Sequence, residues 1–379
     1  MAHTVDVAIC GAGPVGMVLA ALLARRGMHG ARIALIDAKP LSAAMSDPRS
    51  IALSYGSRLL LEEIGAWPIP ATPIHQIHVS RRGQFGRSMI DRGEQDVPAL
   101  GYVTLYGDLV TALAGACERA GVTVMRPARL TGKLEHGDGV SLKLDDGREV
   151  EAAIMVQAEG GVFGEQDGKS LTRDYRQTAV IARVSCSAPI AHRAYERFTD
   201  EGPLALLPQD GADGHQYALV WCVRPESAEG LLGLGDAAFL ARLGEAFGTR
   251  LGRFTATTAR ASYRLGLNAS AGATTRTAAI GNAAQTLHPV AGQGLNLGLR
   301  DAAVLARLLA QGATPARLAQ FGQARRMDRS LTVGLTDTMA RVFTGDAPGQ
   351  ALLGLSLGIL DTVAPARTLL AELMMFGRR

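Results

Sequence analysis

A glycine-rich hexapeptide near the start constrains the fold of this chain more than any other feature. The sequence GAGPVG at residues 11–16 follows a β-branched apolar run, residues 5–10, and precedes a helical pattern that reaches Arg26. A second apolar run, residues 32–37, ends in an aspartate. Strand, glycine turn, helix and second strand in this order predict a dinucleotide-binding βαβ unit.

Each glycine of this loop has its own role in the predicted unit. Gly11 allows the tight turn, Gly13 lets a pyrophosphate approach the backbone, and Gly16 lets the helix pack closely on the strand. Pro14 lies in the same phosphate-binding loop, where the helix N-terminus faces the phosphate charge. Asp37 ends the second strand and is placed to accept hydrogen bonds from a ribose diol. The motif alone does not separate NAD from FAD.

A second glycine-rich loop lies late in the chain, in GNAAQTLHPVAGQGLNLGLRDAA at residues 281–303. It follows an apolar strand pattern, residues 277–280, and leads into a helix from about Leu295. The backbone amides and dipole of a helix N-terminus favour negative charge. A reduced flavin carries such a charge on its pyrimidine side. We therefore expect this second loop to hold an isoalloxazine ring and the first loop to hold a pyrophosphate.

The chain has 379 residues, which predicts two domains or one large domain with an insertion. Residues 178–222 are rich in strand patterns, whereas nucleotide-type elements occur at both ends, so we expect interleaved domains. In the segment DPRSIALS we expect a helix that ends near Gly65, with Ser50 as its cap. The predicted FAD-binding domain comprises 1–72, 98–176 and 270–345, the substrate-binding sheet domain 73–97 and 177–269, and a C-terminal helical segment 346–379.

Composition narrows the class of protein. Apolar residues make up 47% and charged residues 20%, as in a soluble globular enzyme. The net charge is +4, and no basic block is interleaved with aromatics, so nucleic-acid binding has little support. No stretch reaches the ~18 apolar residues of a membrane span. The apolar start lacks a positively charged leader region and is broken by glycines and a proline, so we do not interpret it as a signal peptide.

Cysteine and histidine spacing indicates neither disulfides nor a metal site. None of the four cysteines forms a CxxC pair, which fits free, buried thiols in a reducing cytosol. Cys10 is expected to pack behind the first glycine loop. His75 and His78 have a spacing that could hold a metal, but on a strand their side chains point to opposite faces. We expect no metal site.

Several motifs together resemble one enzyme family. GAGPVG, DPRSIALS at 47–54, AEGG at 158–161 and the late glycine loop resemble the FAD-dependent aromatic hydroxylases of the para-hydroxybenzoate hydroxylase type. The resemblance covers nearly the whole chain, including ERFTDEGPLALLP at 196–208, and is greatest to ubiquinone-biosynthesis hydroxylases of the UbiH/UbiF/VisC type. It implies an α/β fold in which a Rossmann-like FAD-binding domain is interleaved with a β-sheet substrate domain, followed by C-terminal helices.

The resemblance also implies roles for individual residues. The first loop would hold the FAD pyrophosphate, Asp37 the adenosine ribose, and Arg49 the phosphate and ribose region. Glu159 stands where the family usually has Asp, and Asn282 where most members have Asp. The residues implied to bind FAD or line its ring are Gly11, Gly13, Pro14, Gly16, Asp37, Arg49, Glu159, Gly160, Asn282, Pro289, Gly292, Gln293, Gly294, Leu295 and Asn296.

The implied chemistry is that of the cofactor. NAD(P)H reduces FAD, dioxygen adds to give a flavin hydroperoxide, and the ring of a polyprenylated phenol takes up the distal oxygen. Pro289 would lie at the flavin, and His288 is a candidate general base. The alternative for His288, which we favour, is a loop histidine that shapes the turn at Pro289. Two other functions stay open: a hydroxylase of a small soluble aromatic, and a catalytically weak flavoprotein scaffold of a quinone-synthesis assembly.

The apolar C-terminal segment bears on partners and location. Residues 348–379 are apolar and helical in pattern and end in Arg378-Arg379. They fit either a core or homo-oligomer surface, or a helix that contacts a membrane face. We expect a cytoplasmic protein, with peripheral contact at the inner membrane and contact with other ubiquinone-biosynthesis proteins left open.

Overall fold

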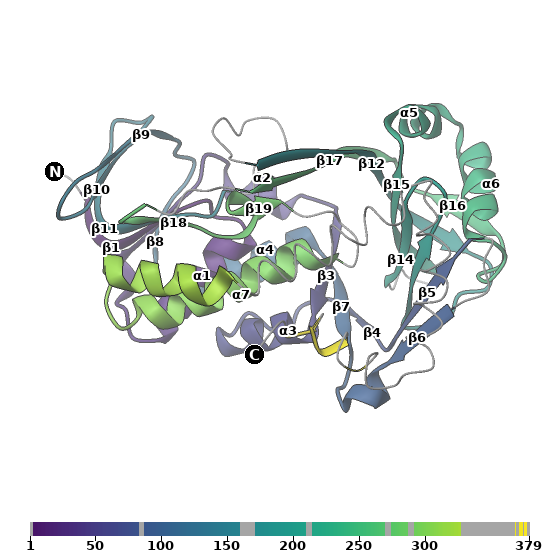
Figure 1. The fold of residues 1–379 in the computed structure, drawn as a ribbon, viewed down its shortest axis with the longest axis horizontal. Coiled ribbons are helices and arrows are strands. Elements are labelled where there is room, and N and C mark those ends of the chain that lie inside the picture. The colour runs from purple at the N-terminus through teal and green to yellow at the C-terminus, as the bar shows by residue number, and fades with distance from the viewer. Residues whose placement is uncertain are drawn as a thin grey trace.

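The computed structural model describes residues 3–82, 87–159, 171–209, 214–269, 274–286 and 292–326, together with 368, 371–373 and 375–376. Two sheets lie at opposite ends of an elongated molecule, with helices packed along the first sheet and a small sheet between the two (Figure 1). This arrangement confirms the expected α/β fold, in which a Rossmann-like unit is interleaved with a second sheet. The domain boundaries stay a prediction.

The first sheet has the strand order β8-β2-β1-β11-β10-β9, and β18 also pairs with β11. Strands β2, β1, β11 and β18 run parallel, as in a dinucleotide-binding fold. Its strands are β1 (His3–Cys10), β2 (Ile33–Ile36), β8 (Thr123–Met125), β9 (Leu130–Glu135), β10 (Val140–Leu144), β11 (Glu149–Gln157) and β18 (Thr277–Ala279).

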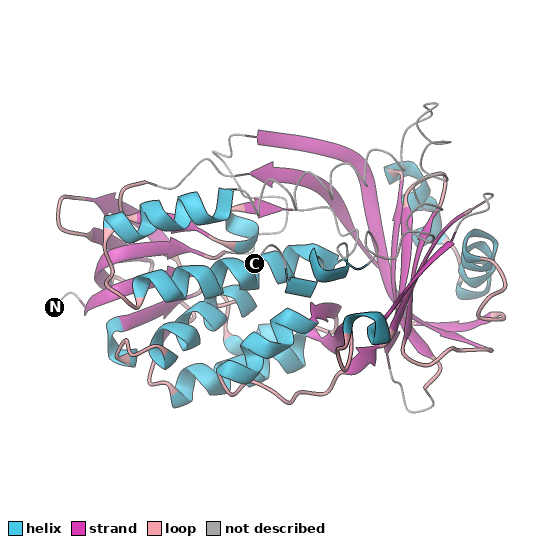
Figure 2. Ribbon diagram, turned by 60° about the horizontal axis from the view of Figure 1, so that its bottom comes forward, coloured by secondary structure: helices cyan, strands magenta, loops and turns pink. Residues whose placement is uncertain are grey.

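Helices α1 (Pro14–Arg25), α4 (Tyr106–Arg119) and α7 (Gln293–Leu309) belong to this Rossmann-like unit, where α1 packs against both others. Figure 2 shows these helices stacked beside the first sheet. Helix α1 is almost wholly apolar, and residues 17–23 are all buried. Because β18 pairs in parallel with β11, a segment near residue 280 is brought beside the N-terminal glycine loop. The two glycine loops are therefore neighbours in space.

The second sheet has the order β19-β17-β12-β15-β14-β13-β5-β6, with β16 also on β12. Helices α5 (Pro225–Gly233) and α6 (Asp236–Phe247) cover its outer face, where Trp221 packs near Phe239 and Tyr195 near Phe247. Its strands are β5 (Gln76–Arg81), β6 (Arg87–Asp91), β12 (Leu171–Cys186), β13 (Arg193–Phe198), β14 (Pro203–Gln209), β15 (Gln216–Val223), β16 (Phe254–Thr257), β17 (Ala261–Ala269) and β19 (Gln285–Thr286).

A small sheet with the order β3-β7-β4 joins the two ends of the molecule. It corrects one expectation, because Ser50–Ser54 forms strand β3 and not the start of a helix. The segment pairs antiparallel with β7 (Gly101–Leu105), which also pairs with β4 (Thr72–Ile74). Helix α3 (Tyr55–Glu63) starts only afterwards, and its cap is Ser54, whose hydroxyl accepts from the Ser57 amide at 3.2 Å.

The remaining short elements are α2 (Leu41–Met45) and the 3-10 turns at Gly30–Arg32, Arg92–Gln95 and Gly281–Ala283. All four cysteines are free and buried, and burial raises the pKa of the Cys10 thiol to about 12. No helix within the described ranges is long and apolar enough to cross a membrane. Most of residues 346–379 lie outside the described residues, but Ala371, Met375 and Phe376 pack near α3 and β6.

Candidate cofactor and substrate site

The first glycine loop has the tight geometry that the sequence predicts. Gly11 has a φ of +110°, and a Cβ there would lie 2.5 Å from the Ala158 carbonyl carbon. A Cβ on Gly16 would lie 1.9 Å from the Gly11 carbonyl oxygen. Only glycine fits either position, because the loop is pressed between helix α1 and the end of β11.

Gly13 differs from its neighbours, because it leaves space. It caps α1 without a side chain, and Pro14 takes the first helical position. The nearest atom to a Cβ built on Gly13 is the Tyr106 hydroxyl, at 3.6 Å. The first amides of a helix have no partner within the helix, so an open cap of this kind suits a phosphate.

Asp37 lies beside the loop and helps to hold it. Its carboxylate accepts from the Ala12 amide at 2.7 Å and from the Lys39 amide at 2.8 Å. A carboxylate has about four lone-pair positions, so two remain for a ribose diol. Asp37 is therefore both a support of the turn and a fitting ribose acceptor.

Arg49 lies where the two sheets approach each other. Its guanidinium donates to the Asp47 carboxylate at 2.6 Å and lies over the ring of Tyr106, 5.0 Å from the centroid. The ring of Tyr263, on β17 of the second sheet, is 5.9 Å away. Burial raises the pKa of Asp47, but the hydrogen bonds and charge of Arg49 outweigh it and keep the pKa below its ordinary value. Arg49 is thus a fixed cation near the first loop.

Glu159 and Asn282 are two residues that the resemblance implies to contact the cofactor. Glu159 follows β11, and its pKa is raised by loss of hydration and then by the charge of Asp37. Asn282 lies exposed in the 3-10 turn after β18. Gly160, predicted to act with Glu159, lies outside the described residues.

The second glycine loop packs directly on the first. Gly281 has a φ of +59°, and a Cβ on it would lie 3.2 Å from Val15. A Cβ on Gly298 would lie 2.8 Å from Val15 and 3.0 Å from the Gly281 Cα. Val15 of the first loop therefore packs closely against Gly281 of the second loop and Gly298 of α7.

The N-terminus of α7 is fixed by one asparagine. Asn296 is buried, and its side-chain oxygen accepts from the Ser54 amide at 2.8 Å and the Ser57 hydroxyl at 2.7 Å. Its nitrogen donates to the Ala52 and Gly292 carbonyls. The Asn296 side chain, which was predicted to line the flavin, therefore ties the glycine loop to β3 and α3. The backbone amides of the turn, and not this side chain, are then the groups that can bind a ligand.

The neighbouring residues of this turn have distinct environments. Gly292 caps α7 in the left-handed region, with a φ of +60°. A Cβ on Gly294 would meet nothing within 4 Å in the described structure, so this side of the turn is open. Leu295 is partly buried against the Rossmann-like core. His288 and Pro289 lie outside the described residues.

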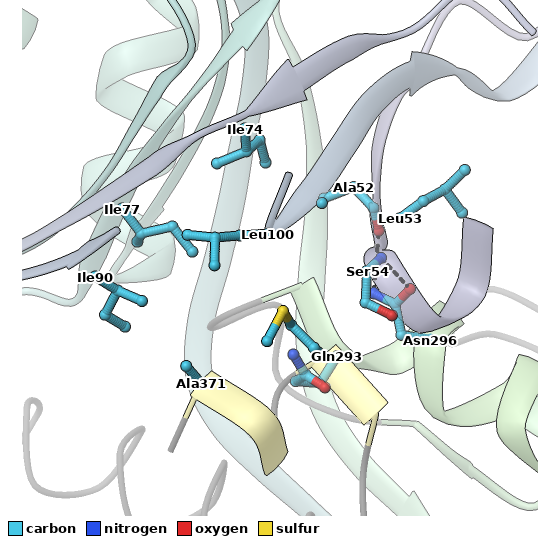
Figure 3. A pocket seen from close by; sticks show the side chains of 12 residues that line it. Ala52, Leu53, Ser54, Ile74, Ile77, Ile90, Leu100, Gln293, Asn296 and Ala371 are labelled. Atoms are coloured by element: carbon cyan, nitrogen blue, oxygen red, sulfur yellow. Dashed lines mark hydrogen bonds between the residues drawn. The ribbon is translucent and has the colours of Figure 1, made fainter. Parts of the chain in front are cut away.

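A small pocket of about 70 Å³, partly open to solvent, lies beside this turn. In Figure 3 the residues of β4, β5 and β6 form one wall, and Gln293 and Asn296 of α7 lie opposite. Ala371 and Met375 from the C-terminal segment close a third side. The apolar lining residues are Ala52, Leu53, Ile74, Ile77, Ile90, Leu100, Ala371 and Met375, and the polar ones are Ser54, Gln293 and Asn296.

Sequence reasoning missed several residues of this region. Tyr106 lies between Gly13 and Arg49, and the Arg126 guanidinium donates to the Lys39 carbonyl at 3.0 Å near the first loop. Neither residue belongs to a motif. Gln293, in contrast, belongs to the stretch Gly292 to Asn296 that the resemblance implies to line the flavin ring. The isoleucine wall, which consists of Ile74, Ile77 and Ile90, had no signal in the sequence, because apolar strand residues are far more often part of the core than of a pocket.

The described residues fit FAD. Gly13 and Gly294 leave open space at two helix N-termini, Asp37 keeps free acceptor positions, and Arg49 supplies a cation. A pyrophosphate needs backbone donors and a cation, and a ribose needs a hydrogen-bond acceptor. An electron-rich ring needs open backbone at a helix N-terminus. Among the described residues no group of three or more His, Cys, Asp or Glu side chains could hold a metal ion.

Comparison with known proteins gives the same result. The model of the family described as FAD binding domain matches residues 4–329. A ubiquinone hydroxylase, UbiL, of Rhodospirillum rubrum is 35% identical and covers 96% of this chain and 88% of its own length. The 3-demethoxyubiquinol 3-hydroxylase of Escherichia coli is 30% identical over 80% of this chain and 79% of its own length.

A solved structure shares the fold along the whole chain. The p-nitrophenol 4-monooxygenase PnpA of Pseudomonas putida superposes with a TM-score of 0.78 and covers 100% of both chains at 18% identity. PqsL of Pseudomonas aeruginosa, in complex with 2-aminobenzoylacetate, gives a TM-score of 0.74 at 19% identity. At these identities the likeness establishes the fold alone.

Proposed function

Because this chain belongs to the FAD binding domain family and to the ubiquinone hydroxylases within it, we propose that it hydroxylates a polyprenylated phenol. The reaction belongs to ubiquinone biosynthesis and consumes NAD(P)H and dioxygen. The observation that carries the proposal is the apolar pocket at the N-terminus of α7. A phenol ring there would lie beside the turn that we assign to the flavin.

The chain's own residues bind, orient and exclude water. We assign the pyrophosphate to Gly11, Gly13 and Gly16, and the adenosine ribose to Asp37. Arg49 would contact the phosphate and ribose region. FAD, when bound, supplies the transfer of electrons from NAD(P)H and the activation of dioxygen.

The second loop and the pocket do the remaining positioning. We assign Pro289, Gly292, Gly294 and Asn296 to the surroundings of the flavin ring, with His288 as a loop residue. The isoleucine wall would keep water away from the reacting ring. Exclusion of water is needed if reduction of the cofactor is to remain coupled to hydroxylation. The polar Gln293 at the other wall can orient a substituent of the ring.

A quinone-lipid profile tests the proposal. Mass spectrometry of cells that lack this gene is expected to show an accumulated polyprenyl phenol that lacks one ring hydroxyl. An unchanged profile, combined with no hydroxylation of a prenylphenol by the purified protein, would contradict the function. Purified protein is expected to consume NAD(P)H faster when the phenol is added and to form the hydroxylated product. Such turnover excludes a scaffold without activity.

The apolar substrate also bears on location and partners. We propose a cytoplasmic enzyme that contacts the inner membrane peripherally, because a polyprenyl chain resides in lipid. Flotation with vesicles of anionic phospholipid is the measurement, and a protein that stays wholly unbound contradicts this part. Contacts with other ubiquinone-biosynthesis proteins would follow from the same location.

A further inference from the structure

Four arginine side chains gather at one corner of the second sheet and have no role in the site described above. They are Arg82 directly after β5, Arg87 at the start of β6, Arg197 on β13 and Arg250 in the turn after α6. We call this set the arginine corner. Strands β5 and β6 and helix α6 lie at the end of the molecule opposite the N-terminus (Figure 1).

Strand pairing places two of these side chains on the same face of the sheet. Ser80 of β5 lies between Arg87 and Arg197 in the register. Residues directly opposite each other on neighbouring strands share a face, because side chains alternate along each strand. The Arg197 guanidinium donates to the Ser80 hydroxyl at 3.3 Å and to the Ala246 carbonyl at 3.1 Å. This is therefore the face that α6 covers.

Two further contacts bring the other arginines to the same corner. The Arg82 amide donates to the carbonyl of Phe198, the residue after Arg197, at 2.9 Å. A Cβ on Gly248, two residues before Arg250, would lie 3.9 Å from the Arg197 guanidinium. Burial lowers the pKa of Arg197 most, and the charges of Arg250 and Arg82 lower it further. Like charges at short range have this effect.

No acid balances these charges within the part of the chain that the structure describes. Asp200 is exposed in the turn after β13, but no ion pair joins it to a described arginine of the corner. Glu245 of α6 is paired with Arg242 at 2.7 Å. Glu196 points to the opposite face of β13, because side chains alternate along the strand. The corner therefore carries several positive charges and little negative charge.

The arginine corner presents this charge to solvent. Arg82, Arg87 and Arg250 are exposed, and only Arg197 is partly covered. Uncompensated like charges repel one another, and an anionic partner relieves that repulsion. The four side chains come from two strand ends, a third strand and a turn. An array spread in this way suits an extended anionic surface better than a small anion, which needs donors that converge in a recess.

The strands that bear the corner also carry a wall of the pocket. Ile77 on β5 and Ile90 on β6 lie opposite each other and line the pocket from the other face of the sheet. Ile90 is three residues from Arg87, which is roughly 10 Å along the strand. A surface that binds the corner is therefore close to the pocket wall. This placement suits a substrate that carries a lipid chain.

We propose that the arginine corner docks the protein on an anionic phospholipid surface. This inference rests on the proposed function, because a polyprenylated phenol resides in lipid. The guanidinium groups would donate to lipid phosphate oxygens, which match their planar, bidentate geometry. Each arginine close to such a surface strengthens binding about 5-fold. The attraction weakens as salt is added, because the charges are exposed.

The test compares the double variant Arg82→Gln/Arg250→Gln with the matched control Arg25→Gln/Arg307→Gln. The control removes the same charge from exposed arginines near the C-terminal ends of α1 and α7. Flotation of the holoenzyme with vesicles of equal parts phosphatidylglycerol and phosphatidylcholine measures the bound fraction. We expect R82Q/R250Q to bind about 25-fold more weakly than the wild type, and R25Q/R307Q to bind as the wild type does.

Three outcomes of the flotation experiment would overturn the inference. The first is an equal bound fraction in the two double variants. The second is a wild type that does not bind these vesicles. The third is a wild type that binds vesicles of phosphatidylcholine alone equally well, because charge would then play no part. Bound FAD and far-ultraviolet circular dichroism show that both variants are folded.

A second readout separates the inference from the proposed function, because flotation needs neither substrate nor turnover. Hydroxylation of 2-geranylphenol is measured without vesicles, and we expect R82Q/R250Q to keep the wild-type rate. If this variant alone loses vesicle binding and the wild type forms no hydroxylated product, the docking surface stands and the proposed function fails. If the wild type hydroxylates the phenol but binds vesicles no better than R82Q/R250Q, the function stands and the inference fails.

Discussion

At the scale of single residues, Gly13 is the sharpest test of the cofactor assignment. Replacement by valine puts a branched side chain where the pyrophosphate is expected, yet only the Tyr106 hydroxyl lies near the new Cβ. We therefore expect Gly13→Val to lose bound FAD and keep its fold. Flavin absorbance after purification, with circular dichroism beside it, measures both.

Gly235 offers a matched control for this change. It caps α6 with extended backbone and no side-chain hydrogen bond, as Gly13 caps α1, and nothing lies within 4 Å of its Cβ position in the described structure. Gly235→Val is expected to purify with full flavin. Equal flavin content in the two variants would refute the pyrophosphate assignment.

Glu196 also makes a prediction about stability. Its pKa is about 8 in the folded chain and near 4.3 when unfolded, so between these values the folded state binds more protons. Stability from this group is therefore lost as pH rises from about 4.3 to 8. Glu196→Gln should match the wild type at pH 4 and exceed it at pH 9, in urea unfolding. A wild type at least as stable as E196Q at pH 9 would contradict the pKa shift.

The sequence identified some of these residues and not others, for physical reasons. Gly11 and Gly16 could be predicted because a side chain at either position would clash with the backbone, whereas Gly13 was predicted only from its place in the motif. Asp37 was predicted as a ribose acceptor, but its bond to the Ala12 amide was not, since it depends on how the loop closes. Glu196 had no signal, because its pKa is raised by burial in a sheet where one neighbouring strand, β5, is distant in sequence.

At the scale of elements, the attachment of α7 depends on Asn296. Its replacement by alanine leaves the buried Ser54 amide, Ser57 hydroxyl and Gly292 carbonyl without their partner. We expect Asn296→Ala to lower the free energy of unfolding by about 2–4 kcal/mol and to weaken FAD binding, because the turn loses its position.

The control for this change is another side-chain amide, in the turn that follows α7. The Gln311 side chain is exposed and makes one hydrogen bond in the described structure, to the Arg307 carbonyl at 3.3 Å. Gln311→Ala should change stability by less than about 0.5 kcal/mol. Chemical unfolding followed by tryptophan fluorescence measures both variants. A loss in N296A as small as that in Q311A would show that the four bonds of Asn296 contribute little.

The one incorrect element shows where local signals fail. Ser50 lies before an apolar run and has the composition of a helix cap, so a helix from this point was a reasonable prediction. The segment is instead extended, because Ile51 and Leu53 can pair with β7, some 50 residues later. Ser54, four residues on, is the cap. Long-range pairing decided between two local possibilities.

At the scale of the whole molecule, the pocket depends on three separated parts of the chain. Ala371, from the C-terminal segment, is buried at its edge, whereas the adjacent Glu372 is exposed. Ala371→Phe should fill part of the pocket, raise the KM for a prenylphenol at least several-fold and leave FAD bound. Glu372→Phe adds the same ring outside and should keep the wild-type KM. Steady-state kinetics that do not separate the two variants would place the substrate elsewhere.

The architecture was more predictable than the pocket. The βαβ fingerprint and the late glycine loop indicated a Rossmann-like unit interleaved with a sheet, which the fold confirms. The pocket could not be predicted, because its walls come from β4 to β6, α7 and the C-terminal segment, and each contributes ordinary apolar residues. Periodicity reports which residues are buried and not which of them meet a ligand.

The packing of α1 has a consequence for how the protein is made. Helix α1 buries residues 17–23 partly against α7, which leaves the ribosome roughly 270 residues later. At a translation rate of about 5–20 residues per second, α7 is synthesised roughly 15–50 s after α1. During that time the nascent chain presents an apolar surface that a holdase chaperone can bind. The two glycine loops can pack together only once Gly298 has been made, because Val15 then meets Gly281 and Gly298.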